Sequence, residues 1–302
     1  MSSIDRRYEY TVLDVFTTRR MEGNPLAVFP HADGISDSQM QQIAQELNLS
    51  ETVFLFKPSD PGKAAARARI FTPRRELDFA GHPTIGTASV LAEQNPDLVG
   101  FTIEENIGPV RIECEFDSSG APMFWLTTPP VRFSETLPPE ACARLLGLSP
   151  VDVAPTPPQF LSAGSPLLFV QLANPEAVDR AELHQEHLAE ALGSVNSGGT
   201  FIFASQGDGF DVYSRMFAPQ IGILEDPATG GATGPLAAYM VRYGLIPAGR
   251  EVRFTSEQGV KMGRRSLLHV NVSGASEPVI KVGGSAIRVV EATFILDREG
   301  GR

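Results

Sequence analysis

The sequence predicts an α+β fold with two similar domains, each a mostly antiparallel or mixed sheet rolled around a central buried helix. One observation is an internal repeat, because residues 69–73 (RIFTP) return as 215–219 (RMFAP). A second is that residues 23–29 (GNPLAVF) return in the same order as 164–170 (GSPLLFV). The third is hairpin-like strand spacing without a dinucleotide-binding GxGxxG motif, which argues against a doubly wound parallel sheet.

The length of 302 residues is about twice that of a typical domain and supports two hydrophobic cores. Prolines at 129–130 mark a change of section, so the predicted domains are 1–128 and 129–284. In the first domain, β-branched and aromatic residues predict strands at 8–16, 26–29, 51–56, 66–71, 101–105, 110–116 and 123–127.

Three helices are predicted from local signals. Ser36 and Gln39 form a capping box ahead of an amphipathic helix over 36–47. Pro83 is expected to start a helix that is apolar on nearly all sides, and such a helix is buried. Its counterpart in the second domain is expected over 231–243 and ends at Gly244.

Charge and composition exclude several functions. The net charge of −11 disfavours binding to nucleic acid, which requires a basic face. The chain lacks an apolar run of 18 residues and an apolar N-terminal signal, so we expect no membrane span and a cytoplasmic location. Cys114 and Cys142 are isolated and are interpreted as small buried apolar residues in a reducing compartment.

Two glycine-rich helix starts are candidate anion sites. Residues 81–86 (GHPTIG) and 226–231 (DPATGG) leave backbone N–H groups uncovered at the positive end of a helix. If both starts face one cleft, they suit a substrate that bears a carboxylate. His82 and Asp226, the titratable residues heading the two segments, are either part of that site or simply helix caps.

Glu51 is the third candidate, because it opens a strand that is otherwise almost wholly apolar. Desolvation at the rim of a core raises the pKa of a carboxyl, which suits a general acid/base, although a solvated Glu at a strand start is the plain alternative. Arg69 and Arg215 occupy matching places in the repeat. They could clamp a carboxylate, but pairing with an internal acid to hold the fold is the favoured interpretation. The hairpin of 256–259 and 263–266 is expected at the surface or an interface.

The sequence lacks a nucleophile elbow, a metal-ligand cluster and a P-loop. The remaining acid/base residues and helix starts fit proton transfer at carbon without a cofactor or a metal. That chemistry is the isomerisation or epimerisation of a small carboxylate.

Four segments resemble the PhzF phenazine-biosynthesis family: 23–29 (GNPLAVF), 48–52 (NLSET), 79–84 (FAGHPT) and 225–230 (EDPATG). The resemblance extends from about residue 10 to about residue 294. It implies the diaminopimelate epimerase-like fold, an active site between the two domains, and a segment 285–302 that returns to complete the first domain. A homodimer is implied in the same way.

The resemblance also implies an activity, the isomerisation of trans-2,3-dihydro-3-hydroxyanthranilate. In this interpretation Glu51 moves the proton between ring carbons, and His82 and Asp226 orient the substrate. The pocket is then lined by Ser50, Gly81, Gly230 and Gly231. Epimerases of the superfamily place two cysteines at the helix starts, where this chain is expected to hold His82 and Asp226.

Two departures from the family pattern are Gly231, where Ser is common, and Arg265, where Pro is frequent. Gly231 leaves the identity of the substrate undecided.

Three alternative functions remain. The chain could be an epimerase or racemase of a small amino or hydroxy acid, using His82 and Asp226 as opposed acid/bases. It could also be a small-molecule binding protein without turnover, or a structural partner protein.

Overall fold

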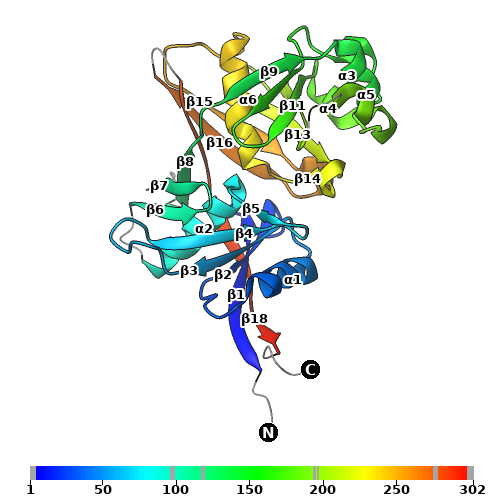
Figure 1. Ribbon diagram of the computed structural model, residues 1–302. Helices are drawn as coiled ribbons and strands as arrows, with labels where there is room; N and C mark the ends of the chain where they lie inside the picture. Colours follow the sequence, from blue (N-terminus) through cyan, green and yellow to red (C-terminus); the bar gives the residue numbers. More distant parts are fainter. Residues whose placement is uncertain are drawn as a thin grey trace. The chain divides into compact units, whose positions relative to one another are not determined.

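The computed structural model describes residues 5–95, 99–116, 120–192, 195, 197–274 and 278–297. The chain divides into two compact units (Figure 1). The first unit comprises Met1–Leu126 and Ser285–Arg302, and the second comprises Thr127–Gly284. Both units contain a mixed sheet and a buried helix, as the repeat predicts.

The first unit contains one sheet with the strand order β18-β1-β2-β3-β4-β6-β7-β8. Neighbours are antiparallel except for the parallel pairs β2–β3 and β4–β6, and the short β5 lies against β4. The elements are β1 (Arg6–Val15), β2 (Asn24–Phe29), α1 (Asp37–Leu47), β3 (Glu51–Phe56), β4 (Ala66–Phe71), β5 (Glu76–Leu77), α2 (Gly81–Gln94), β6 (Gly100–Glu105), β7 (Gly108–Phe116), β8 (Pro122–Thr127) and β18 (Ala286–Leu296).

The second unit repeats this order as β9-β10-β11-β12-β13-β15-β16-β17, with parallel pairs β11–β12 and β13–β15 and with β14 against β13. Its strands are β9 (Arg132–Thr136), β10 (Gln159–Ser162), β11 (Pro166–Gln171), β12 (Gly199–Ser205), β13 (Val212–Ala218), β14 (Ile223–Asp226), β15 (Val252–Gln258), β16 (Ser266–Ser273) and β17 (Val279–Gly284). Its helices are α3 (Pro139–Leu145), α4 (Pro175–Arg180), α5 (Leu188–Leu192) and α6 (Gly230–Arg242), with 3₁₀ turns η1 (Pro150–Asp152), η2 (Gln185–His187), η3 (Pro219–Ile221) and η4 (Val260–Met262).

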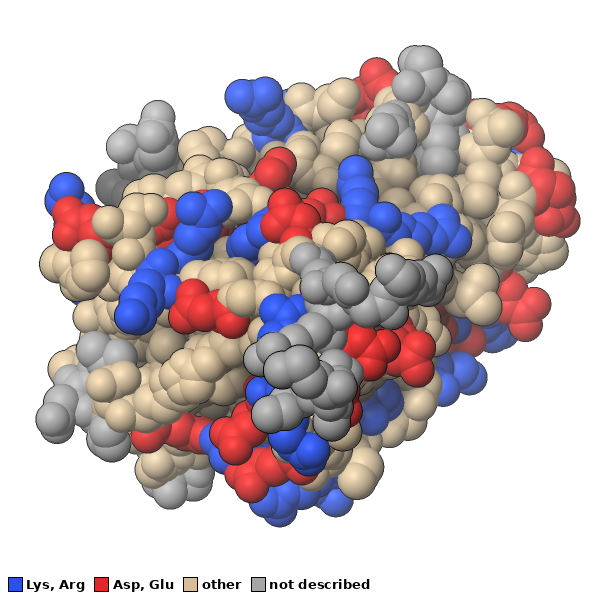
Figure 2. Space-filling model, turned by 60° about the horizontal axis from the view of Figure 1, so that its bottom comes forward, with Lys and Arg blue, Asp and Glu red and all other residues tan. Residues whose placement is uncertain are grey.

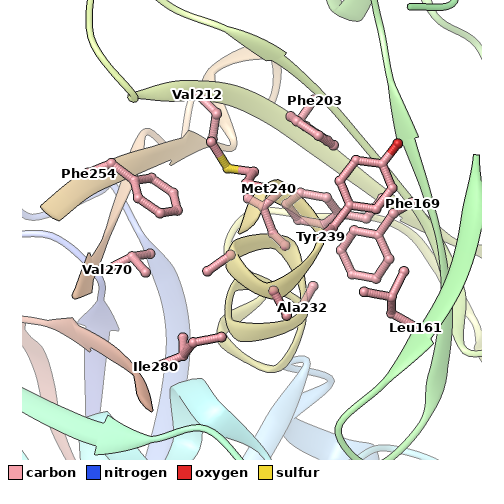
Figure 3. Close-up of a cluster of buried hydrophobic side chains, with 14 of the residues drawn as sticks. Leu161, Phe169, Phe203, Val212, Ala232, Tyr239, Met240, Phe254, Val270 and Ile280 are labelled. Carbon is pink, nitrogen blue, oxygen red and sulfur yellow. The ribbon is translucent and has the colours of Figure 1, made fainter. Parts of the chain in front are cut away.

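The central strands β3 and β12 are buried on both faces, and successive side chains of each point to opposite sides. On β12, Phe201 and Phe203 pack on α6, whereas Ile202 and Ala204 pack in the cluster that includes α3 and α4. Figure 3 shows side chains from several strands converging on α6. The apolar runs of the sequence follow from this two-sided burial.

Strand register identifies equivalent residues in the two units. Leu26 pairs with Glu51 across β2–β3, and its repeat partner Leu167 pairs with Gly199 across β11–β12. The next rung agrees, since Thr52 pairs with Phe71 in one unit and Thr200 pairs with Phe217 in the other. Gly199 therefore occupies, in the second unit, the position of Glu51 in the first.

The sequence predictions for α1 and for the burial of the two cysteines are confirmed. Ser36 and Gln39 form the capping box of α1, and Asn48 ends the helix in the left-handed conformation. Cys114 and Cys142 are free and buried, and burial raises the pKa of the Cys142 thiol to about 12. In the described part of the chain, no helix is long and apolar enough to cross a membrane. The face in Figure 2 carries interspersed acidic and basic side chains rather than one basic surface.

Candidate active site

Glu51 and His82 meet inside the first unit. Phe54 of β3 packs in the cluster with α1, so the alternation along β3 directs Glu51 to the opposite face, toward α2. His82 lies in the first turn of α2, and its Nε2 atom is 3.3 Å from Glu51 Oε2. Both residues are buried, with 5% of His82 and 9% of Glu51 exposed. The structure thus brings together two of the three residues predicted to do chemistry.

His82 is a neutral imidazole in this environment. Burial lowers its pKa from 6.5 to about 3, and a hydrogen bond to the Pro25 backbone opposes that shift only in part. Asn24 Nδ2 lies 3.4 Å from His82 Nδ1 and fixes the ring from its other side. The contact with Glu51 is therefore between a carboxyl group and a neutral ring, not an ion pair between full charges. A neutral imidazole can accept a proton or donate one.

The remaining predicted residues of the first unit adjoin this pair. Gly81 is the first residue of α2 and is buried, and Ser50 is half-buried directly before Glu51. The first turn of α2 contains no acidic side chain, and its N-cap, Ala80, has no side-chain oxygen to bind the first N–H groups. An uncapped helix start of this kind favours an anionic ligand.

Asp226 ends β14 in the second unit and is 8% exposed. Its Oδ2 atom accepts a 2.6 Å hydrogen bond from Thr229 Oγ1, and Thr229 is the N-cap of α6. Gly230 and Gly231 are the first two residues of that helix. A Cβ atom at Gly231 would meet nothing within 4 Å, so this position has room for the side chain that the family commonly carries there.

Gln258 is a buried partner of Asp226 and Thr229 that the sequence did not reveal. Its side-chain amide donates to the Asp226 carbonyl at 2.7 Å and to Thr229 Oγ1 at 3.0 Å, and its oxygen accepts from Thr229 N at 3.1 Å. The predicted hairpin exists as β15–β16, but its expected surface location is wrong for Gln258, which is fully buried. The alternation of side chains along the strand could have indicated its burial, because Gln258 lies an even number of residues from Val252 and Phe254 and so shares their buried face of β15.

The sequence suggested that His82 and Asp226 occupy equivalent positions at the two helix starts, but hydrogen bonds and strand register show a different equivalence. Thr84 Oγ1 donates back to Ala80 O in α2, and Thr233 Oγ1 donates back to Thr229 O in α6. These matching bonds make Gly231 the equivalent of His82. Asp226 pairs with Met216 as Leu77 pairs with Ile70, so Asp226 is the equivalent of Leu77.

The prediction that His82 and Asp226 occupy matching helix starts is therefore wrong. Neither residue is an N-cap, because Ala80 and Thr229 hold those positions. Proline also does not mark the starts as predicted, since α2 begins two residues before Pro83 and Pro227 precedes α6 altogether.

The repeated arginines hold the fold, as predicted. Arg69 donates to both carboxylate oxygens of Glu76 at 2.7 Å and to Asp37 at 2.6 Å. Arg215 donates to both oxygens of Glu225 at 2.8 and 2.9 Å, and to the carbonyls of Val178 and Ala181 beside the end of α4. Because Glu225 directly precedes Asp226, Arg215 also anchors the strand that carries Asp226.

Replacing Gln258 by Leu is expected to destabilise the protein by about 1–3 kcal/mol, because Thr229 N and the Asp226 carbonyl lose buried partners. Loosening of Asp226 should also raise KM more than it lowers kcat. Urea unfolding and steady-state kinetics measure the two effects. Gln206→Leu, at an exposed position, is the control. Equal unfolding free energies and equal kinetic constants for the two variants would contradict the assigned role of Gln258.

The sequence profile of the PhzC-PhzF family, described as phenazine biosynthesis-like protein, matches residues 13–292. The chain belongs to this family. It is 34% identical to trans-2,3-dihydro-3-hydroxyanthranilate isomerase of Pseudomonas chlororaphis, over 96% of this chain and 100% of that protein. The crystal structure of a PhzF-family protein of Bacillus anthracis superposes with a TM-score of 0.86 at 25% identity, covering 96% and 99% of the two chains.

The PhzF-family fold extends to more distant enzymes. A hydroxyproline epimerase of Agrobacterium vitis matches with a TM-score of 0.64 at 13% identity, over 100% of this chain and 94% of that chain. This likeness concerns the fold alone and confirms the predicted diaminopimelate epimerase-like class. The chain is an isomerase of the PhzF family, as its similarity to named isomerases predicts.

Proposed function

We propose that the protein isomerises a small cyclic carboxylate without a cofactor, with Glu51 as the general acid/base. The supporting observation is the buried contact of Glu51 with neutral His82 at the uncapped start of α2. As a carboxylate, Glu51 removes a proton from one carbon, and the electron pair of the broken C–H bond forms a new C=C bond. The existing double bond shifts, and protonated Glu51 returns the proton to a second carbon. Substrate and product are isomers, so the step needs no oxidant.

The unequal residues of the two units support isomerisation over two-base epimerisation. Epimerisation requires one acid/base on each face of a single carbon. In this chain the position equivalent to Glu51 is Gly199, and the position equivalent to His82 is Gly231. Neither glycine has a side chain that transfers protons, so matched acid/bases are not supplied by equivalent positions.

The other site residues are proposed to bind the substrate. Ser50, Gly81 and the first N–H groups of α2 suit the substrate carboxylate, which the helix dipole favours. Asp226, with Gly230 and Gly231, is the proposed contribution of the second unit to substrate orientation. The compound named for the 34%-identical relative, trans-2,3-dihydro-3-hydroxyanthranilate, is the proposed substrate.

The position of deuterium in the product tests this proposal. Incubated with trans-2,3-dihydro-3-hydroxyanthranilate in D₂O, the protein is expected to yield a positional isomer. NMR should then find the transferred hydrogen or solvent deuterium at a carbon other than the one that lost its proton. Deuterium at the original carbon with inverted configuration would establish epimerisation instead. No turnover by folded protein would refute this substrate.

We further propose the homodimer, the cytoplasmic location and the domain limits 1–128 and 129–284, with 285–302 completing the first domain. Sedimentation equilibrium of the purified protein tests the homodimer directly. A mass equal to that of one 32.5 kDa chain at micromolar concentration would contradict it.

A further inference from the structure

Glu105, the last residue of β6, is another buried carboxyl group of the first unit. It is 4% exposed, and its Oε1 atom lies 2.7 Å from Thr84 Oγ1. Its Oε2 atom is buried without a hydrogen-bond partner among the described residues. A carboxylate with one oxygen desolvated and unpaired is costly, whereas a neutral carboxylic acid is much less so.

The Thr84 hydroxyl shows which group donates. Thr84 Oγ1 is 2.7 Å from Glu105 Oε1 and also 2.7 Å from Ala80 O, but a hydroxyl has one hydrogen. In α6 the equivalent Thr233 donates its hydrogen to Thr229 O at 3.0 Å. If Thr84 does the same toward Ala80 O, the hydrogen between Thr84 and Glu105 has to come from the acid.

The second unit carries a neutral donor at the matching position. Arg67 pairs with Glu104 across β4–β6, as Tyr213 pairs with Glu257 across β13–β15. The next residues, Glu105 and Gln258, are therefore equivalent. Gln258 donates through its amide to Thr229 Oγ1 at the start of α6. The acceptors differ, because Thr229 is equivalent to Ala80 and Thr84 to Thr233, but a protonated Glu105 would likewise donate to a threonine hydroxyl in the first turn of the helix.

Several charged groups near Glu105 are engaged with other partners. Glu104 pairs with Arg67 of β4 at 3.5 Å, and Glu76 of β5 pairs with Arg69. His82 in α2 is neutral and contacts Glu51. Within the described ranges no cation pairs with Glu105. Burial raises its pKa to about 8, and the hydrogen bond with Thr84 opposes this shift only in part.

We propose that Glu105 is a positioning residue that acts as a neutral carboxylic acid, donating its proton to Thr84 Oγ1 and so fixing the first turn of α2 that carries His82. A charged Glu105 would place a negative charge beside the helix start and compete there with an anionic ligand. The neutral acid holds the turn and leaves the helix dipole to the substrate. This benefit to the substrate rests on the proposed function, whereas the protonation state does not.

Glu105→Gln tests the protonation state without substrate, because Gln is a neutral isostere and occurs naturally at the equivalent position. Infrared spectra at pH 7 should show a protonated-carboxyl band in the wild type that is missing in Glu105→Gln. Glu104→Gln, which changes the neighbouring carboxylate, should retain the band. A wild-type spectrum without this band, or a band that persists in Glu105→Gln, would overturn the proposal that Glu105 is the protonated acid.

The pH dependence of stability gives an independent readout. Burial raises the pKa of Glu105 from its ordinary value of 4.5 to about 8, so as the pH rises the unfolded chain releases this proton before the folded protein does. Wild-type stability should therefore fall as pH rises from 4.5 to 8 and level off above that. In Glu105→Gln this fall should shrink, so that its thermal midpoint at pH 8 is higher by several degrees. A midpoint at pH 8 below that of the wild type would overturn the proposal.

Kinetics separate positioning from proton transfer. Glu105→Gln should keep kcat within about threefold of the wild type, whereas Glu105→Leu, which removes the donor, should lower it at least tenfold. A kcat in folded Glu105→Gln that falls a hundredfold would overturn the proposal and make Glu105 a proton-transfer group. Failure of the proposed function is recognised separately, because Glu51→Gln would then leave turnover unchanged while the infrared result stands.

Discussion

Replacing Glu51 by Gln is expected to lower kcat by roughly 10²- to 10⁴-fold, the range that general acid/base catalysis contributes. Gln preserves the size and shape of the side chain, and it can still contact His82 at about the observed 3.3 Å. It cannot take up a proton from carbon at neutral pH. Substrate binding should change little, so KM should stay within a few fold while kcat falls. Steady-state kinetics and thermal unfolding of the same preparation measure these effects.

Glu46→Gln is the matched control for this experiment. Glu46 lies exposed on α1, five positions before Glu51, so the same chemical change should leave kcat unaltered. A Glu51→Gln protein that folds normally and turns over at the wild-type rate would refute the acid/base assignment. In that case a binding protein or a different base would have to be considered.

Replacing Arg215 by Met is expected to lower the free energy of unfolding by about 3–5 kcal/mol, the cost of breaking a buried ion pair from one side. Arg215 is 8% exposed, and the side chain of its partner Glu225 is 18% exposed. The substitution leaves Glu225 without its cation and the Val178 and Ala181 carbonyls without their donor. Equilibrium unfolding in urea at neutral pH measures the loss.

Two further variants make the Arg215 experiment specific. Arg215→Lys keeps the charge but cannot form the forked pair of bonds with Glu225, so its loss of stability should be intermediate. Arg253→Met removes an exposed arginine that pairs with Glu251, and it should cost less than about 1 kcal/mol. Equal unfolding midpoints for Arg215→Met and the wild type would show that the buried pair contributes nothing.

Much of the fold was predictable because its signals are local. The strand over 51–56 and the helix over 36–47 follow from residue types, periodicity and a capping box, and the structure places both within a residue of the prediction. The burial of α2 on all sides follows from its composition in the same way. The internal repeat extended these local predictions to the whole chain: because the same segments occur twice in the same order, it predicted two similar units.

Which residues of the two units are equivalent depends on strand pairing and on hydrogen bonds at the helix starts, and the sequence alone does not show these. Connecting segments of different length follow β4 and β13, so aligning the repeat at these strands misaligns the helices that come next. Only strand register and the back-bonds of Thr84 and Thr233 show that His82 corresponds to Gly231. Gln258 was missed for a similar reason, since its partners lie on β14 and at the start of α6, far away in the sequence.

Gly199 bears on how this chain can evolve. A Cβ atom at that position would lie 2.6 Å from the Phe217 carbonyl oxygen and 2.7 Å from Met216 Cε, so any side chain there requires β13 to move. A single substitution therefore cannot place a carboxylate at the position equivalent to Glu51 without displacing β13. The difference between these two equivalent positions, Glu51 and Gly199, is thereby maintained by the backbone itself.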